Sequence, residues 1–153
     1  MSRWRLWVTS LPLVWLVACG AQLNNEQAAL TTQQHYEHWL SMSEDYQITF
    51  QQQCYCLPEY LQPMRLTVRD NKLISAIFVN DGSPVPAAML KDLPTVKEIF
   101  ETVIEAELRP AEIIKIEFDQ QHHYPTKVDI DYDLRMADEE IQWQLSNPSF
   151  ATN

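Results

Sequence analysis

The sequence predicts a single α+β domain built of two layers, an antiparallel sheet with two helices on one of its faces. Three observations lead to this prediction. Apolar residues recur at helical spacing in two segments and alternate with polar residues in five others, a further segment at 72–79 is apolar on both faces, and the order is helix, three strands, helix, three strands. Strands that follow one another without an intervening helix pair in antiparallel fashion, so each group of three is expected to form a meander.

Both predicted helices begin at a capping box. Thr31 is followed three residues later by Gln34, and Thr95 by Glu98, a spacing that lets each side chain bond the backbone N–H of the other residue. We expect helices at about residues 32–43 and 95–108. The second has the stronger amphipathic pattern, with apolar residues at i, i+3, i+4, i+7 and i+8. These residues are Val96, Ile99, Phe100, Val103 and Ile104.

The alternating segments and the apolar one predict strands at 46–56, 64–70, 72–79, 114–118, 128–132 and 141–145. Asp70-Asn71 is expected to make a tight turn between the second and third strands. Residues 80–94 contain three prolines and Gly82 and are expected to form a long loop. Asn147-Pro148 is expected to begin a flexible tail, which sets the domain at 31–147 and the tail at 148–153.

Residues 1–18 have the pattern of a secretory signal peptide, with two arginines, an apolar stretch and the small Ala18 before Cys19. The apolar stretch is too short to cross a bilayer, which takes about 20 residues. The motif Leu16-Val17-Ala18-Cys19 resembles a bacterial lipobox. The resemblance implies cleavage before Cys19, a lipid on Cys19, a tether at 19–30 and the membrane as a partner. The alternatives are a cleaved signal with an incidental cysteine and an uncleaved anchor.

The composition limits where in the cell the protein is expected and which classes of partner it can bind. Gly20 follows the cysteine where many lipoproteins of the inner membrane carry an aspartate, so the same resemblance favours the periplasmic face of the outer membrane. The 21 acidic residues outnumber the 11 basic ones, for a formal net charge of −10. Because phosphate contacts need Lys and Arg, no nucleic-acid partner is expected. Gly20 and Gly82 are the only glycines, which excludes Gly-rich phosphate loops, and no cofactor is predicted.

Cys54 and Cys56 are the cysteines that remain once Cys19 is acylated. In the oxidising environment of the cell envelope, such a pair of cysteines can form a disulfide. Residues i and i+2 of a strand have Cα atoms about 6.5–7 Å apart, at the upper limit for a bridge, so a disulfide here would need a bulge. A structural disulfide, two buried thiols, and a redox or metal role all stay open.

Four acidic residues have the spacing of positions 1, 3, 5 and 12 of an EF-hand calcium loop. They are Asp129, Asp131, Asp133 and Glu140. Leu134 occupies position 6, where such a loop needs glycine for a sharp turn. The first three acids also alternate with apolar residues, as in a strand. We therefore expect a solvent-facing acidic patch, able to pair with Arg65 and Arg69 across the sheet, in preference to a calcium site.

Several short motifs occur in a fixed order along the domain. They are Cys54-Tyr55-Cys56, Thr95-Val96 with Phe100, Phe118-Asp119 with Tyr124-Pro125, Asp129 with Asp131, and Asp138-Glu139-Glu140. Together they resemble a family of small uncharacterised bacterial envelope lipoproteins, over most of residues 36–145. Similar sequences usually carry a glycine in the turn before Tyr124, where this chain has Gln120-Gln121-His122-His123. The resemblance implies no particular activity.

No catalytic residues are predicted. His122 and His123 are adjacent, and neighbouring side chains on an extended backbone point apart, which is poor geometry for one metal ion. A tethered, acidic, two-layer domain without a catalytic signature favours a binding or assembly module of the cell envelope. Its expected partner is another envelope protein, and an inhibitor or immunity protein is one version of this role. A metal- or redox-dependent periplasmic enzyme is the alternative.

Overall fold

The computed structural model describes residues 30–42, 44–109, 111–136 and 140–151. The predicted signal peptide and Cys19 lie outside these ranges, and of the predicted tether only Leu30 lies within them. In chain order the elements are α1 (Thr32–Leu40), β1 (Tyr46–Gln53), the short 3-10 helix η1 (Pro58–Leu61), β2 (Met64–Arg69), β3 (Lys72–Phe78), α2 (Ala87–Leu90), α3 (Val96–Leu108), β4 (Ile113–Phe118), β5 (Pro125–Asp131) and β6 (Glu140–Phe150).

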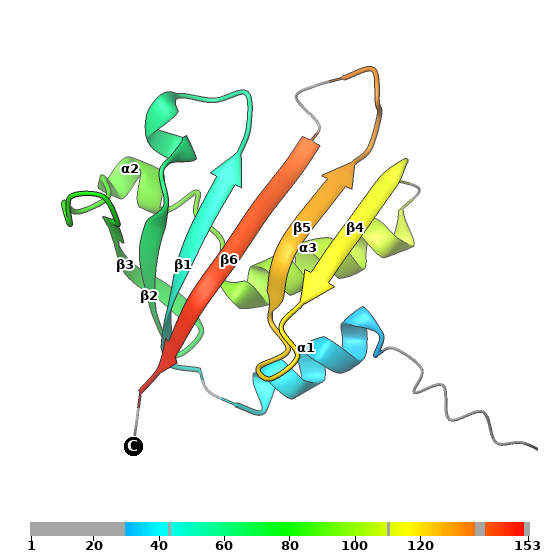
Figure 1. Ribbon diagram of the computed structural model, residues 1–153, viewed down its shortest axis with the longest axis horizontal. Coiled ribbons are helices and arrows are strands. Elements are labelled where there is room, and N and C mark those ends of the chain that lie inside the picture. Colours follow the sequence, from blue (N-terminus) through cyan, green and yellow to red (C-terminus); the bar gives the residue numbers. More distant parts are fainter. Residues whose placement is uncertain (1–29, 43, 110, 137–139, 152–153) are drawn as a thin grey trace, which may run out of the picture.

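The strands form one six-stranded sheet in the order β3-β2-β1-β6-β5-β4, and each neighbouring pair is antiparallel. Two meanders, β1 to β3 and β4 to β6, meet where β1 lies beside β6 (Figure 1). Both α1 and α3 lie behind the sheet in this view, and the opposite face is open. The predicted α+β domain with two helices on one face of an antiparallel sheet is confirmed.

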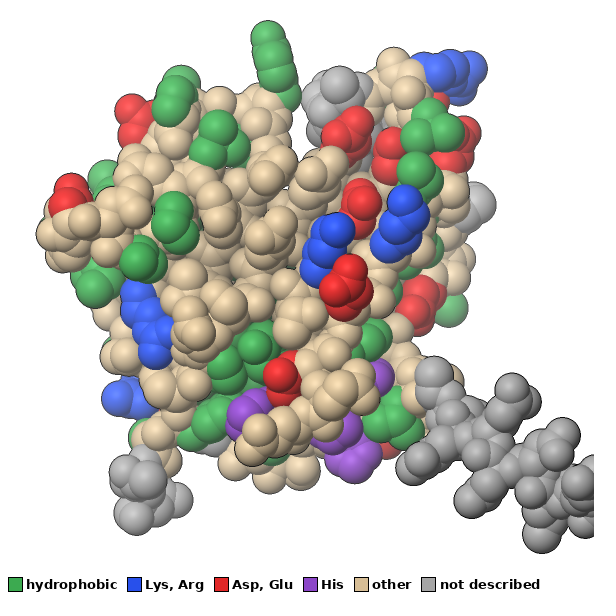
Figure 2. All heavy atoms as spheres, in the orientation of Figure 1, with side chains coloured by type: hydrophobic (Ala, Val, Ile, Leu, Met, Phe, Trp, Pro, Cys, Tyr) green, Lys and Arg blue, Asp and Glu red, His purple; other side chains and the backbone are tan. Residues whose placement is uncertain are grey.

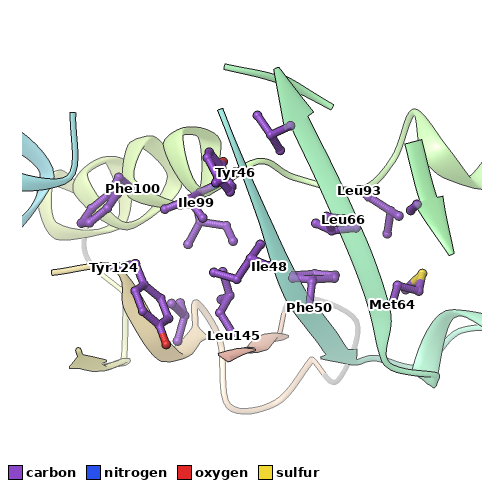
Figure 3. Close-up of a cluster of buried hydrophobic side chains, with 14 of the residues drawn as sticks. Tyr46, Ile48, Phe50, Met64, Leu66, Leu93, Ile99, Phe100, Tyr124 and Leu145 are labelled. Carbon is purple, nitrogen blue, oxygen red and sulfur yellow. The ribbon is translucent and has the colours of Figure 1, made fainter. Parts of the chain in front are cut away.

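The core fills the space between the sheet and the helices (Figure 3). Alternate residues of β1, namely Tyr46, Ile48 and Phe50, are 0–1% exposed and face Ile99 and Phe100 of α3. The spacing of 3.6 residues per turn puts the apolar stripe of α3 on one side, as the sequence predicts. The remaining apolar core of the second meander and of β2 comprises Met64, Leu66, Val68, Val128, Ile130 and Leu145.

Both capping boxes are present. The Thr31 hydroxyl accepts from the Gln34 backbone, and the Gln34 side chain accepts from the Thr31 backbone at 2.8 Å. Thr95 and Glu98 make the same pair of bonds, with 2.7 Å between the Thr95 nitrogen and Glu98. These bonds satisfy N–H groups that a helix leaves free at its start. The predicted starts of α1 and α3 are therefore confirmed.

The ends of several elements differ from the sequence prediction. β6 continues to Phe150, which pairs with Tyr46 of β1, so residues 148–150 belong to the sheet and not to a tail. The register of β1 and β6 shifts between Gln47 and Thr49, and Pro148 falls within this irregularity, where its missing N–H breaks no ladder bond. The predicted loop at 80–94 contains the single-turn helix α2, which starts after Pro86.

Candidate functional site

The centre of the open face of the sheet shows few charged or hydrophobic side chains (Figure 2). Across the central strands β1 and β6, Gln51 lies opposite Gln144 and Gln53 lies opposite Gln142. Strand residues alternate between faces, and the intervening residues of both strands point into the core, so these four glutamines point to the open side. The centre of the face is thus a cluster of uncharged donors and acceptors.

A groove follows this glutamine cluster. A hollow of about 160 Å³ is lined by the four glutamines and Lys127, among others. A hollow of about 380 Å³ shares Gln51, Lys127 and Gln144 with it, and another of about 290 Å³ shares Gln53 and Gln142. The three hollows therefore form one groove along β1 and β6. Each amide both donates and accepts hydrogen bonds, as a peptide group does.

Charged side chains of alternating sign lie on the same face, over β4 and β5 (Figure 2). Lys115 lies opposite Asp129, and Glu117 lies opposite Lys127. Opposite charges facing one another across two antiparallel strands stabilise the pair by about 0.2–1 kcal/mol. This edge of the groove therefore carries charge of both signs in equal number and favours neither an anionic nor a cationic ligand.

Cys54 and Cys56 lie at one end of the groove, and Cys54 lines its last hollow. Their sulfur atoms are at disulfide-bonding distance, and their Cα atoms are 5.2 Å apart. β1 ends at Gln53, so both cysteines follow the strand in a bend, where the Cα atoms come closer than strand spacing allows. Both cysteines are exposed, and Tyr55 between them is 96% exposed. The predicted strand through residue 56 is too long, and the thiols are not buried.

A second cluster lies at the other end of the molecule, where all four histidines of the chain gather (Figure 2). The Nδ1 atoms of His35 on α1 and His123 in the β4–β5 turn are 3.2 Å apart. His38, one turn along α1, stacks on His123 with 4.4 Å between ring centroids. His122 turns away from this pair and places its Nδ1 3.1 Å from Asp119.

The surroundings disfavour the protonated forms of His35 and His123. Burial lowers the pKa of His35, and the neighbouring His123 and His38 lower it further. Burial, followed by the neighbouring His38, likewise lowers the pKa of His123, and the Asp119 carboxylate opposes part of this shift. For Asp119 burial opposes ionisation, but N–H bonds from His122 and Gln121 outweigh it, so the pKa of this carboxyl lies below its usual range. The cluster thus combines two imidazole rings whose protonation is disfavoured with a nearby carboxylate.

The comparison with protein families covers this whole domain. Residues 31–150 match a family of unknown function, DUF6174. The chain belongs to this family. The match takes in every helix and strand found among the described residues, and it agrees with the resemblance to an uncharacterised domain. No curated protein and no solved structure matches the chain.

In this DUF6174 domain the four acidic residues of the calcium pattern lie on two neighbouring strands and in the turn after β5. Asp129 and Asp131 lie along β5, Glu140 begins β6 opposite Asp131, and Asp133 binds Arg135 at 2.9 Å. Within the described ranges, no three or more His, Cys, Asp or Glu side chains are grouped so as to hold a metal ion. Asp131 is not solvent-facing as predicted. It is only 6% exposed, and its carboxylate accepts from the Asp133 N–H.

The two arginines of the DUF6174 domain that were predicted to pair with these acids bind elsewhere, because β1 and β6 separate β2 from β5. Arg65 reaches across β1 and donates to the Asn147 carbonyl and, at 2.9 Å, to the Ser149 hydroxyl. Arg69 lies 3.6 Å from Asp45. Arg65 therefore ties β2 to the irregular part of β6.

No helix in the described part of the chain has the length and apolar character needed to cross a membrane.

Proposed function

We propose that this DUF6174 protein is a lipid-anchored binding or assembly module of the bacterial cell envelope, held by Cys19, and that it recognises another envelope protein through the groove of glutamines. The periplasmic face of the outer membrane is its proposed location. The observation that carries the proposal is the open face of the sheet. α1 and α3 both pack on the other face, and the open one presents Gln51, Gln53, Gln142 and Gln144 around a continuous groove.

The chemistry of the groove favours a polypeptide as ligand. The four amides carry both donors and acceptors, which match the C=O and N–H groups of a peptide segment. Gln51 uses one N–H to bond the Leu61 carbonyl, and Gln142 uses one to bond Glu140. The flanking charges Lys115, Glu117, Lys127 and Asp129 balance, so this edge of the groove does not select a ligand of one charge. Recognition then depends on hydrogen bonds along an extended segment laid over β1 and β6.

A pair of matched substitutions tests the groove. Gln144→Arg places a long cation in the groove, whereas Gln33→Arg makes the same change on exposed α1. The lipidated protein and both variants are crosslinked in their own membranes and captured. We expect a defined envelope protein to be captured with the wild type and with Gln33→Arg, and to be lost with Gln144→Arg. Equal capture by all three would exclude the groove as the binding surface.

A separate substitution tests the anchor. Cys19→Ala removes the thiol that the lipobox would acylate, so the variant should stay unprocessed or become soluble. Fractionation of membranes and size analysis of the chain measure both. If the variant stays in the membrane fraction at full mature size, the lipoprotein assignment is wrong.

A redox role is the second candidate, and one observation favours it. The cysteine pair is exposed, and Cys54 lines the last hollow of the groove together with Tyr55 and Glu140. A disulfide placed so can be reached by a thiolate of another protein, which would attack one sulfur and release the other as a thiolate. Capture through Cys54→Ser or Cys56→Ser as a mixed disulfide, instead of through noncovalent contacts, would favour this alternative.

A further inference from the structure

We propose that His35 and His123 bind a divalent transition-metal ion, with zinc as the best fit, through their two Nδ1 atoms, and that water fills the other coordination positions. Imidazole nitrogen is a preferred ligand of zinc, copper and nickel. Two nitrogens about 2.0–2.1 Å from a tetrahedral zinc ion are about 3.3–3.4 Å apart. The observed separation of the two Nδ1 atoms is 3.2 Å. This pair therefore needs only a small rotation of the rings to bind the ion.

The residue choice on α1 supports the site. Thr32, His35 and Trp39 are the buried residues of this helix, and they follow one another at helical spacing. The central position of a buried stripe is normally apolar. Here it holds a histidine that stacks on Phe118, with 3.9 Å between ring centroids and an angle of 6° between the rings. The stacking fixes the ring plane and so directs its Nδ1 toward His123.

The residue choice in the β4–β5 turn supports it independently. His123 has a φ of 61°, in the left-handed region that favours glycine. A side chain there strains the backbone, and strain of this kind is found where a site requires a particular side chain. Local structure alone would favour an apolar residue at position 35 and glycine at position 123. Both positions hold histidines instead, and their Nδ1 atoms are in contact.

Negative charge near the two rings favours a bound cation between their Nδ1 atoms, as opposed to a direct hydrogen bond from one ring to the other. The Asp119 carboxylate lies in the same turn, where its oxygen accepts the His122 N–H at 2.6 Å, and the chain carries a net charge of −10. Binding requires both rings to carry their proton on Nε2, which frees the two Nδ1 atoms. Asp119 and His122 stay bonded to each other, outside the pair.

Zinc titration of the full chain, purified in detergent without a histidine tag, tests the site. We expect saturable binding of one Zn²⁺ ion by calorimetry, together with a rise in Tm. His123→Gly removes a ligand at a position whose φ suits glycine, so this variant should keep its fold and lose zinc binding. Loss of an outer-shell partner weakens metal binding by roughly 10–100-fold, so loss of a direct ligand should weaken it at least tenfold.

Two further variants make the test specific. His35→Gln removes the other ligand and should lose binding to the same degree, with its fold checked by circular dichroism. His122→Gln is the matched control, since His122 is adjacent to His123 but bonds Asp119, and it should bind zinc as the wild type does. The proposal fails if the wild type shows no saturable zinc binding, if His123→Gly binds as well as the wild type, or if His122→Gln loses binding equally.

Discussion

Tyr46→Phe is expected to destabilise the domain because it removes one buried hydrogen bond between the two layers. The Tyr46 hydroxyl accepts the backbone N–H of Val96 at 3.0 Å, and both residues are 1% exposed. Val96 is the first residue of α3, where the N–H has no partner within the helix. The phenyl ring fills nearly the same volume, so the main effect is an orphaned buried N–H.

Leaving a buried donor without a partner costs about 1–3 kcal/mol. For a domain of this size, a loss of about 2 kcal/mol lowers Tm by roughly 6–12 °C. Tyr60→Phe is the control, because the Tyr60 hydroxyl donates to Asp92 at 3.5 Å on the surface, and its removal should cost about 0.5 kcal/mol or less. Urea denaturation and thermal unfolding measure both variants. If Tyr46→Phe loses no more stability than Tyr60→Phe, the bond does not hold α3 to the sheet.

The same variant gives an alkaline signature. Burial raises the pKa of Tyr46 far above its ordinary value near 10. The unfolded chain then ionises this tyrosine near pH 10 while the folded chain keeps the proton. Stability is therefore full below about pH 10 and falls above it, by about 1.4 kcal/mol per pH unit for this group. Unfolding of Tyr46→Phe should depend less steeply on pH above 10 than unfolding of the wild type.

Three other predictions follow from single contacts. Thr95→Ala removes the buried N-cap of α3 and should cost about 1 kcal/mol in urea denaturation, since alanine cannot accept the Glu98 N–H. Replacing Cys54 and Cys56 together by serine should cost at most about 2 kcal/mol and leave the fold cooperative, because the bridge closes a loop of two-residue separation. Calcium titrated at physiological salt should give no saturating micromolar heat signal, since Asp131 already accepts the Asp133 N–H and Asp133 binds Arg135, and a signal that disappears in Asp131→Asn would contradict this expectation.

The elements that could be predicted are those whose signals are local. The capping boxes at Thr31 and Thr95 mark helix starts correctly, because the bonded groups are only three residues apart. The Asp70-Asn71 turn is also local, and both residues have positive φ, at 48° and 56°. Proline misled the prediction twice. Pro86 begins α2 inside the predicted loop, and Pro148 lies within β6, at an irregularity that only the pairing with β1 creates.

The contacts of the site depend on the pairing of distant segments, which no local pattern contains. The glutamine groove needs β6 to lie beside β1, although the two strands are at opposite ends of the domain. The same order of strands places Arg65 out of reach of the acids on β5, contrary to the sequence prediction. Alternation along each strand identifies which residues share a face, but the neighbours across the sheet follow from the order of the strands.

The histidine pair shows how a departure from a local rule can locate a site. Sequence analysis compared His122 with His123 because they are adjacent, whereas the nitrogens that meet belong to His35 and His123, 88 residues apart. One signal was available in the sequence, since His35 falls between Thr32 and Trp39 on the stripe that α1 buries. A buried histidine in a short helix requires a polar partner from another element, because an unpaired ring nitrogen in the core is costly. The β4–β5 turn supplies that partner, His123, at a position with φ of 61°. The histidine pair therefore combines a strained backbone at His123 with a polar residue in the core at His35.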